Sequence, residues 1–326
     1  MNVILKSQLE NGKHGEAVTG VCLIKGYTVK LTKTGKEYIE GQLQSGSIIN
    51  FKAWGGSTAF PKLKSENYET VPTFIQGNFD EYNGSVSIVL SDVTAVEGFS
   101  AEQFLEERYN SEAYLSGVKQ IISNSVSAKG VELVNKMLFS NRDLVDRFAV
   151  EFAASTHHDN CKSGLLAHTY KGLCLIPWVL STYPSLACKF DKEGNLTKSE
   201  DRVDLLYIGY LLHDIGKTIE MHTGVYTSVS FLTHRILGLD LLFKFKDDII
   251  ATYGEFWFRE LESIMVQHHG EFDDKCRTVS SYIIHKIDCF EANMQNLAQG
   301  LVSDARLSPA GAMLYQEDYR LAIPME

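Results

Sequence analysis

The sequence predicts a multidomain protein in which a small N-terminal β-domain is followed by an all-helical domain. In residues 16–97, short segments rich in β-branched and aromatic residues partly alternate between apolar and polar positions, as strands do. From about residue 99, apolar residues recur at i, i+3, i+4 and i+7, and only two prolines occur between residues 73 and 308. The length of 326 residues also fits two domains.

Six segments of the N-terminal part are predicted strands: AVTGVCLI, YTVKLTKT, EYIEGQLQ, SIINFKAW, VPTFIQGNF and SVSIVLSDV. Glycine-containing breaks are expected to separate them at residues 25–26, 34–36, 45–46 and 82–84. Asn83-Gly84, between two apolar segments, is typical of a tight hairpin turn. Five or six short strands predict a small barrel or sandwich. We expect this domain to span residues 1–97, with a helical linker and the start of the helical domain over 98–150, and the rest of that domain over 151–326.

Composition narrows the class of protein further. No apolar segment is long enough for a transmembrane helix, and the first residues lack the pattern of a signal peptide, so a cytoplasmic location is expected. The six cysteines are scattered without a C-x-x-C pair, which argues against a zinc ribbon or a disulfide framework. The net charge of −10 argues against a protein that coats nucleic acid non-specifically. Most of this charge lies beyond residue 97, where an acidic domain would suit bound cations.

Nine of the ten histidines fall in the helical half. The notable elements are His168 in GLLAHTYKG, His213-Asp214 in LLHDIGKT, His234 in FLTHRILG, His268-His269 in IMVQHHGE and Asp288 in IIHKIDCFEANM. Each follows an apolar segment and is expected near a helix end. A single such histidine is typical of a hydrogen-bonded core or surface residue. Five elements in order within 121 positions instead indicate a metal site, because imidazole and carboxylate suit Mn, Fe, Zn and similar ions.

This order of residues resembles the HD superfamily of metal-dependent phosphohydrolases, for which HDIGK is the specific core. The closer resemblance is to the YhaM-type 3′–5′ exoribonucleases of Gram-positive bacteria, which place an OB-fold before an HD domain. FAASTHHDNCKSGLLAHT and IIHKIDCFEANM match elements of that family over most of the chain. Glu291 stands where the family usually has a second Asp, and Ser163-Gly164 replaces a Gly-Gly pair.

The resemblance implies an OB-like barrel that binds single strands, then an HD phosphohydrolase domain with one or two divalent ions. By position, one ion would be held by His168, His213, Asp214 and Asp288. Asp214 would bridge to a second ion bound by His234 and His268, with His269 as a ligand or phosphate contact. Mn²⁺ is the expected metal, with Mg²⁺, Fe²⁺, Co²⁺ and Ni²⁺ as alternatives. Two ions can clamp the attacking and leaving oxygens of a displacement at phosphorus.

Three further residues are candidates for catalysis. Lys217 follows Asp214 by three residues and could neutralise charge on phosphoryl oxygens, or be a solvated lysine near a helix end. His157 and His158 could contact phosphate or protonate the leaving group, or be surface residues of a loop.

A strand-binding surface is also predicted on the barrel. Its candidates are Lys25, Tyr27, Lys30, Lys33, Lys36, Tyr38 and Trp54. Cations along a groove and aromatic stacking platforms are typical of single-strand binders. Taken one at a time, aromatic residues of a small barrel more often fill its core.

The predicted function is therefore a metal-dependent 3′–5′ exonuclease of single-stranded RNA, and action on single-stranded DNA as well stays open. The alternatives are a phosphohydrolase of nucleotides or cyclic dinucleotides, a non-catalytic single-strand-binding protein and a di-iron oxygenase. No membrane partner is expected, and homo-oligomer formation stays open.

Overall fold

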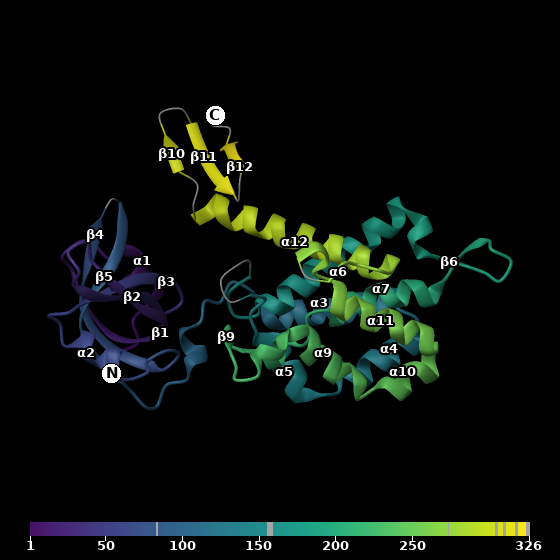
Figure 1. The fold of residues 1–326 in the computed structure, drawn as a ribbon, viewed down its shortest axis with the longest axis horizontal. Helices are drawn as coiled ribbons and strands as arrows, with labels where there is room; N and C mark the ends of the chain where they lie inside the picture. Colours follow the sequence, from purple (N-terminus) through teal and green to yellow (C-terminus); the bar gives the residue numbers. More distant parts are fainter. Residues whose placement is uncertain are drawn as a thin grey trace. The chain divides into compact units, whose positions relative to one another are not determined.

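The computed structural model describes residues 1–82, 84–154, 159–272, 274–303, 306–308, 311–316 and 319–323. The chain divides into two compact units, Met1–Arg108 and Tyr109–Glu326 (Figure 1). The first unit is a β-barrel and the second is mainly helical, so the predicted fold class is confirmed.

Five strands close the barrel of the first unit. They are β1 (Ala17–Leu31), β2 (Glu37–Gln44), β3 (Ile48–Trp54), β4 (Pro72–Tyr82) and β5 (Ser85–Ala95), in the spatial order β1-β2-β3-β5-β4 with β1 also paired to β4. All pairings are antiparallel except that of β3 with β5. The short helices α1 (Lys6–Asn11) and α2 (Ala59–Ser65) and the 3₁₀ turn η1 (Ala101–Phe104) complete the unit. This closed five-stranded arrangement is the OB-like barrel that was expected.

The barrel core explains the partial alternation of the sequence. Inward positions such as Ile39, Phe51, Ile75 and Ile88 are fully buried. Their neighbours along each strand are more exposed, as the two-residue period of a strand requires.

Two turn predictions have different outcomes. The break predicted at residues 25–26 is wrong, because β1 continues through it and the register with β2 shifts between Ile24 and Gly26, as at a β-bulge. The first two predicted strands are therefore one bent strand. The hairpin predicted after β4 is confirmed, since Tyr82 pairs with Ser85 and Gly84 has a φ of +75°. Asn83 lies outside the described residues.

The second unit packs its helices around one apolar core. In chain order these are α3 (Ser111–Ser125), α4 (Ala128–Val134), a π-helical turn η2 (Asn135–Phe139), α5 (Arg142–Val150), α6 (Gly164–Thr182), η3 (Pro184–Ala187), α7 (Glu200–Leu212), α8 (Lys217–Glu220), η4 (Ser230–Leu232), α9 (Thr233–Phe243), α10 (Lys246–Tyr253), α11 (Glu255–Gln267), η5 (Gly270–Phe272) and α12 (Val279–Ser303). Short antiparallel strand pairs, which the helical spacing did not predict, interrupt them: β6 (Cys188–Phe190) with β7 (Leu196–Lys198), and β8 (Met221–His222) with β9 (Val225–Tyr226). A three-stranded sheet follows α12, formed by β10 (Arg306–Ser308), β11 (Gly311–Gln316) and β12 (Tyr319–Ile323).

Helix α7 is the central element of this unit. The Ser199 hydroxyl caps its N-terminus by accepting a hydrogen bond from the backbone N–H of Arg202, and two acidic residues in the first turn favour the positive end of the helix dipole. All residues from Asp204 to Leu212 are buried, so the helix is surrounded by protein on every side. It therefore delivers His213 and Asp214, which follow directly, into the interior of the domain.

The structure contains no membrane-spanning candidate among its described helices, since none combines sufficient length with sufficient hydropathy.

Candidate metal centre

Five helices bring the predicted ligands together. His168 lies in the second turn of α6, His213 and His268 cap the C-termini of α7 and α11, and His234 lies in the first turn of α9. All four histidines are buried. His213 and His268 follow an apolar helix at its end, as expected, whereas His168 and His234 lie near the beginning of their helices. Asp288 instead lies within α12, where its side chain is 17% exposed.

The first group of ligand atoms consists of His168, His213 and Asp288, with one oxygen of Asp214 beside it. Asp288 Oδ1 lies 3.0 Å from His168 Nε2 and 3.6 Å from His213 Nε2. Asp214 Oδ2 lies 3.9 Å and 3.4 Å from the same two nitrogens. Ligands at about 2.0–2.2 Å from one ion are themselves about 3–3.5 Å apart, so these separations suit a single cation.

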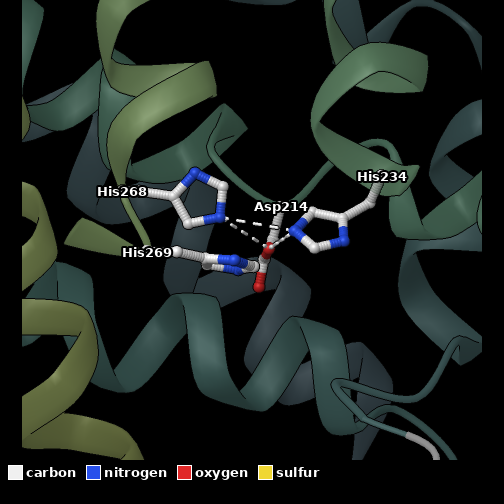
Figure 2. Close-up of side chains that lie close together, drawn as sticks. All are labelled: Asp214, His234, His268 and His269. Carbon is white, nitrogen blue, oxygen red and sulfur yellow. Dashed lines mark hydrogen bonds and ion pairs between the residues drawn. The ribbon is translucent and has the colours of Figure 1, made fainter. Parts of the chain in front are cut away.

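The second group consists of His234, His268 and His269 around the other oxygen of Asp214. Figure 2 shows the carboxylate of Asp214 pointing between the rings of His234 and His268. Asp214 Oδ1 lies 3.4 Å from His234 Nε2 and 3.5 Å from His268 Nε2. Asp214 thus faces one group with each oxygen, the arrangement that a bridging carboxylate needs.

A layer of acceptors behind the histidines fixes which ring nitrogen faces the centre. The Nδ1–H of His213 donates to the carbonyl oxygen of Tyr210 over 2.6 Å, and that of His268 to Met265 over 3.0 Å. Carboxylates accept from the other two: Glu291 from His168, and Glu220 from His234 over 3.0 Å. With Nδ1 committed in this way, every Nε2 points inward, as metal-binding histidines require.

The inward-facing atoms fit a cation. His213 Nε2 and Asp214 Oδ1 are buried and make no hydrogen bond within the described part of the chain. His234 Nε2 and His268 Nε2 face each other at 3.4 Å although each ring already donates through Nδ1. Lone pairs in this position repel unless a positive charge lies between them. The donor set of imidazole and carboxylate suits Mn²⁺, Fe²⁺, Co²⁺, Ni²⁺ or Zn²⁺.

The pKa values of the first group are those of a charged network. Burial alone lowers the pKa of His168, but hydrogen bonds to Asp288 and Glu291 outweigh burial and raise it to about 10. Burial likewise lowers the pKa of His213, but Asp214 and Asp288 raise it to about 9. Conversely, burial raises the pKa of Asp288, but the two histidines outweigh burial and hold it well below its usual range.

The second group behaves in the opposite way. Burial, followed by the nearby imidazoles, lowers the pKa of His269 to about 3. Burial is also the main cause of the lowered pKa of His268. These two rings are therefore neutral near pH 7 and have lone pairs for a metal.

A third cluster, of Asp159, His168 and Glu291, is close enough to resemble a ligand set but already contains a cation. Lys171 Nζ lies 2.7 Å from Asp159 Oδ2 and 2.8 Å from Glu291 Oε1. Tyr109 donates to the other oxygen of Asp159. We therefore interpret this cluster as support for His168 and assign it no ion.

Backbone contact sets the distance between the segments that carry Asp214 and His234. A Cβ atom on Gly216 would lie 1.9 Å from the carbonyl oxygen of His234 and 2.6 Å from the backbone nitrogen of Gly238. Only glycine allows this approach at residue 216. The Gly of HDIGK and the Gly of THRILG thus meet where α8 begins and α9 passes.

Lys217 lies on the same side as Asp214, as its spacing predicted. Its Nζ is 2.6 Å from Asp214 Oδ2, and its side chain is 14% exposed. Burial lowers the pKa of Lys217, but Asp214 outweighs burial and raises it. The ammonium therefore lies at the edge of the first ligand group. His157 and His158 lie outside the described residues, so their predicted roles have no structural test.

Several supporting residues were not found from the sequence: Lys171, Glu220 and His285, together with the contact of Glu291 to His168. His285 Nδ1 lies 2.7 Å from the carbonyl oxygen of His268 and so holds the turn that carries this ligand. A common signal exists, because Lys171, Glu291 and Glu220 each follow a predicted site residue (His168, Asp288 and Lys217) by three positions on a helix.

On the barrel, three of the seven predicted strand-binding residues lie side by side. Lys30 pairs with Tyr38 across β1 and β2, and Tyr38 pairs with Trp54 across β2 and β3. The two aromatic rings are 5.0 Å apart, and Trp54 is 41% exposed. Lys30 forms an ion pair with Glu40 over 2.8 Å.

The other four predicted barrel residues are placed differently. Lys33 and Lys36 are exposed around the turn between β1 and β2. Tyr27 packs against the barrel core, and its hydroxyl donates to the carbonyl oxygen of Glu66. Less of its ring surface is therefore accessible for stacking on a base. Lys25 is partly buried at the bulge of β1.

Comparison with known proteins finds a matching domain family and similar proteins. Residues 184–293 match the HD domain, a range that includes His213 to Asp288 and leaves His168 to be supplied by α6. The 3′-5′ exoribonuclease YhaM of Listeria monocytogenes serotype 4b is 25% identical over 304 residues, which cover 89% of this chain and 90% of that protein. The protein of the same name from Bacillus velezensis is 26% identical over 303 residues, 86% of each chain. A solved replication protein A heterotrimer bound to ssDNA aligns with 28% of this chain and 64% of its own, at 14% identity and a TM-score of 0.20, too low to indicate a shared fold. The resemblance to the YhaM-type family is thereby confirmed.

Proposed function

We propose that this chain is a metal-dependent 3′–5′ exoribonuclease that also accepts single-stranded DNA, with residues 151–326 as the catalytic domain and residues 1–97 as the strand-binding domain. The observation that carries the proposal is the Asp214 carboxylate, whose two oxygens face two separate groups of ligand atoms. Similarity to exoribonucleases over most of the chain supports the choice of substrate. The cytoplasm is the proposed location.

The two ligand groups would hold two divalent ions, with Mn²⁺ as the expected metal. When bound, such ions supply an activated water and neutralise charge on the phosphate. His168, His213 and Asp288 would hold one ion, His234, His268 and His269 the other, and Asp214 both. The other catalytic roles would be filled by side chains of the protein.

Lys217 would place a cation at the reacting centre. Because its Nζ lies 2.6 Å from Asp214 Oδ2, Lys217 would be well placed to contact a phosphoryl oxygen bound on the side of the first group. There it would stabilise negative charge as the phosphodiester bond breaks. His157 and His158 keep their proposed roles as phosphate contacts or as the acid for the leaving oxygen.

The surface formed by Lys30, Tyr38 and Trp54 would bind the strand. The exposed Trp54 ring, with the partly buried Tyr38 ring beside it, offers stacking area to bases of any sequence, and each stacked base contributes about 1–3 kcal/mol. An exonuclease that shortens RNA regardless of sequence needs such sequence-tolerant contacts.

The decisive experiment incubates the full chain and Mn²⁺ with 5′-labelled RNA and DNA oligomers, single- and double-stranded. We expect a ladder that shortens stepwise from the 3′ end, with single strands preferred. Internal cleavage, or turnover of cyclic dinucleotides alone, would favour the phosphohydrolase alternative. Failure to bind any divalent metal would favour a non-catalytic binder.

The role of the barrel needs its own test. Trp54→Ala should weaken binding of single-stranded RNA by about 1–3 kcal/mol, measured by fluorescence anisotropy without metal. Tyr82→Ala is the matched control, because this aromatic residue is 70% exposed at the end of β4, away from the proposed surface. Equal losses in the two variants would contradict the assignment.

A further inference from the structure

A large apolar groove runs between α6 and α12 in the helical unit. Its volume is about 620 Å³, and the residues that line it are Leu175, Trp178, Val179, Tyr183, Leu186, Val279, Tyr282, Ile283, Lys286, Ile287 and Phe290. Of these described lining residues, Lys286 alone carries a charge. Trp178 is 61% exposed and Tyr183, Tyr282 and Phe290 are all more than half exposed. Exposed apolar surface of this extent marks a site of association in soluble proteins.

Helix α12 continues this apolar surface with a regular spacing. Apolar residues alternate at intervals of four and three along it: Ile283, Ile287, Phe290, Met294, Leu297 and Leu301. This is the heptad pattern of a helix that packs against another helix of the same kind. The first two are buried within the unit, whereas Met294 and Leu301 are 45% and 46% exposed. The heptad row therefore begins in the core and ends in solvent.

The chemistry of the groove limits what can cover it. A nucleic acid would need several cations, but the lining offers a single lysine. A heptad row calls for a second helix with matching apolar spacing. Every other copy of this chain presents such a helix, and a two-fold axis brings the same surface of both copies together.

The exposed area is also of the right size. An aromatic side chain buries about 150–250 Å² when fully covered, so half-exposed side chains offer on the order of 100 Å² each. The four aromatic residues of the groove, with Val279, Met294 and Leu301, thus supply most of the roughly 800 Å² per partner that a standard interface buries.

We propose that two copies of this chain associate through the α6–α12 groove and the exposed heptad row of α12. This assigns a surface to the homo-oligomer that the sequence left open, and it does not depend on which substrate the metal centre cleaves.

The test is the molar mass of the full chain in solution, measured by light scattering after gel filtration and by sedimentation velocity at 1–50 µM. The wild-type mass should be at least that of a dimer. Met294→Asp combined with Leu301→Asp should lower the number of copies at least twofold, because association would bury two charges on each copy. Trp178→Ser is a milder second variant, expected to weaken association at least tenfold.

Phe256→Asp is the matched control, since this phenylalanine is 81% exposed on α11 outside the groove. It should keep the wild-type mass. Circular dichroism of each variant checks that the helices are intact. A monomeric wild type at 50 µM would overturn the proposal, as would folded groove variants that keep the wild-type mass. Loss of association in the Phe256 control as well would also contradict it.

Discussion

The two halves of the candidate metal centre share one carboxylate but differ in charge. The half formed by His168, His213 and Asp288 contains a second carboxylate, and Glu291 supports it from behind. The half formed by His234, His268 and His269 contains imidazoles only, apart from the shared Asp214. Without bound metal, the first half holds protons on His168 and His213 at neutral pH, whereas His268 and His269 are neutral.

This difference indicates what balances the buried acids before a metal arrives. In the first half, protons and the ammonium groups of Lys171 and Lys217 do so. A cation entering there must displace protons, while one entering the second half meets the neutral imidazoles of His268 and His269. The two halves should therefore load with different pH dependence, and that contrast can be tested.

Removal of the shared ligand should have the largest effect, because it strikes both halves. Asp214→Asn keeps the side-chain volume but removes the charge that faces both groups. Hydrolysis should fall by more than about 10³-fold, since activation of water by the ions is lost. Mn²⁺ titration by calorimetry should show weakened binding at both sites. Unchanged affinity at one site would mean that Asp214 does not bridge.

The pH dependence of metal binding comes next in size. The first-half histidines have pKa values of about 10 and about 9, so about two protons must leave at pH 7 when a metal binds there. Its affinity should rise by up to about 100-fold per pH unit between pH 7 and 8.5, while affinity of the second half stays nearly constant. Calorimetry in buffers of different ionisation enthalpy counts the protons. If metal binding released no protons, the predicted difference in protonation between the two halves would be wrong.

The same pKa shifts predict a stability profile. Because His168 and His213 have raised pKa values when folded, their contribution to stability is full below about pH 6.5 and is lost as pH rises through 9 and 10. The lowered pKa of Asp288 acts at the other end, since its contribution is lost below about pH 4. Thermal unfolding of the EDTA-treated protein should therefore show a lower Tm at pH 9.5 than at pH 7.

Changes to the supporting carboxylates should have intermediate effects on separate halves. Glu291→Gln removes the charge behind His168, and Glu220→Gln removes the charge behind His234. Each should weaken metal binding about 10–100-fold in its own half only. Glu291→Gln should also reduce the number of protons released, whereas Glu220→Gln should not. Equal losses in both halves from either variant would show that the supports are not separate.

The smallest effect is expected at His285. His285→Leu removes the hydrogen bond to the carbonyl of His268, which contributes about 1 kcal/mol. Affinity of the second half should fall about five-fold, and affinity of the first half in the same variant is the control. A larger loss of metal affinity in the first half would contradict the assignment of His285 to the support of His268.

The sequence predicted the order of the two domains and picked out residues that the structure brings together as candidate ligands, because both depend on local patterns. Strand alternation and helical spacing reflect which residues are buried. The order of histidines and aspartates along the chain can be recognised as a motif without the structure. The bulge at Gly26 was missed because a glycine next to a lysine reads as a turn unless the partner strand is known. Lys171 was missed because its partner Glu291 becomes a neighbour only through packing of α6 against α12. His285 was missed because the carbonyl of His268 reaches it only through packing of α11 against α12.

The contact at Gly216 bears on how the centre tolerates a change of ion. Main-chain atoms at Gly216 and His234 are in contact, and this contact limits how closely the segments of Asp214 and His234 approach. No change of side-chain rotamer can alter that distance. An ion of different radius must then be accommodated by the imidazoles of His268 and His269 or by the carboxylate of Asp288. Adaptation to another metal would accordingly occur through those side chains, while the main-chain contact between Gly216 and α9 keeps its spacing.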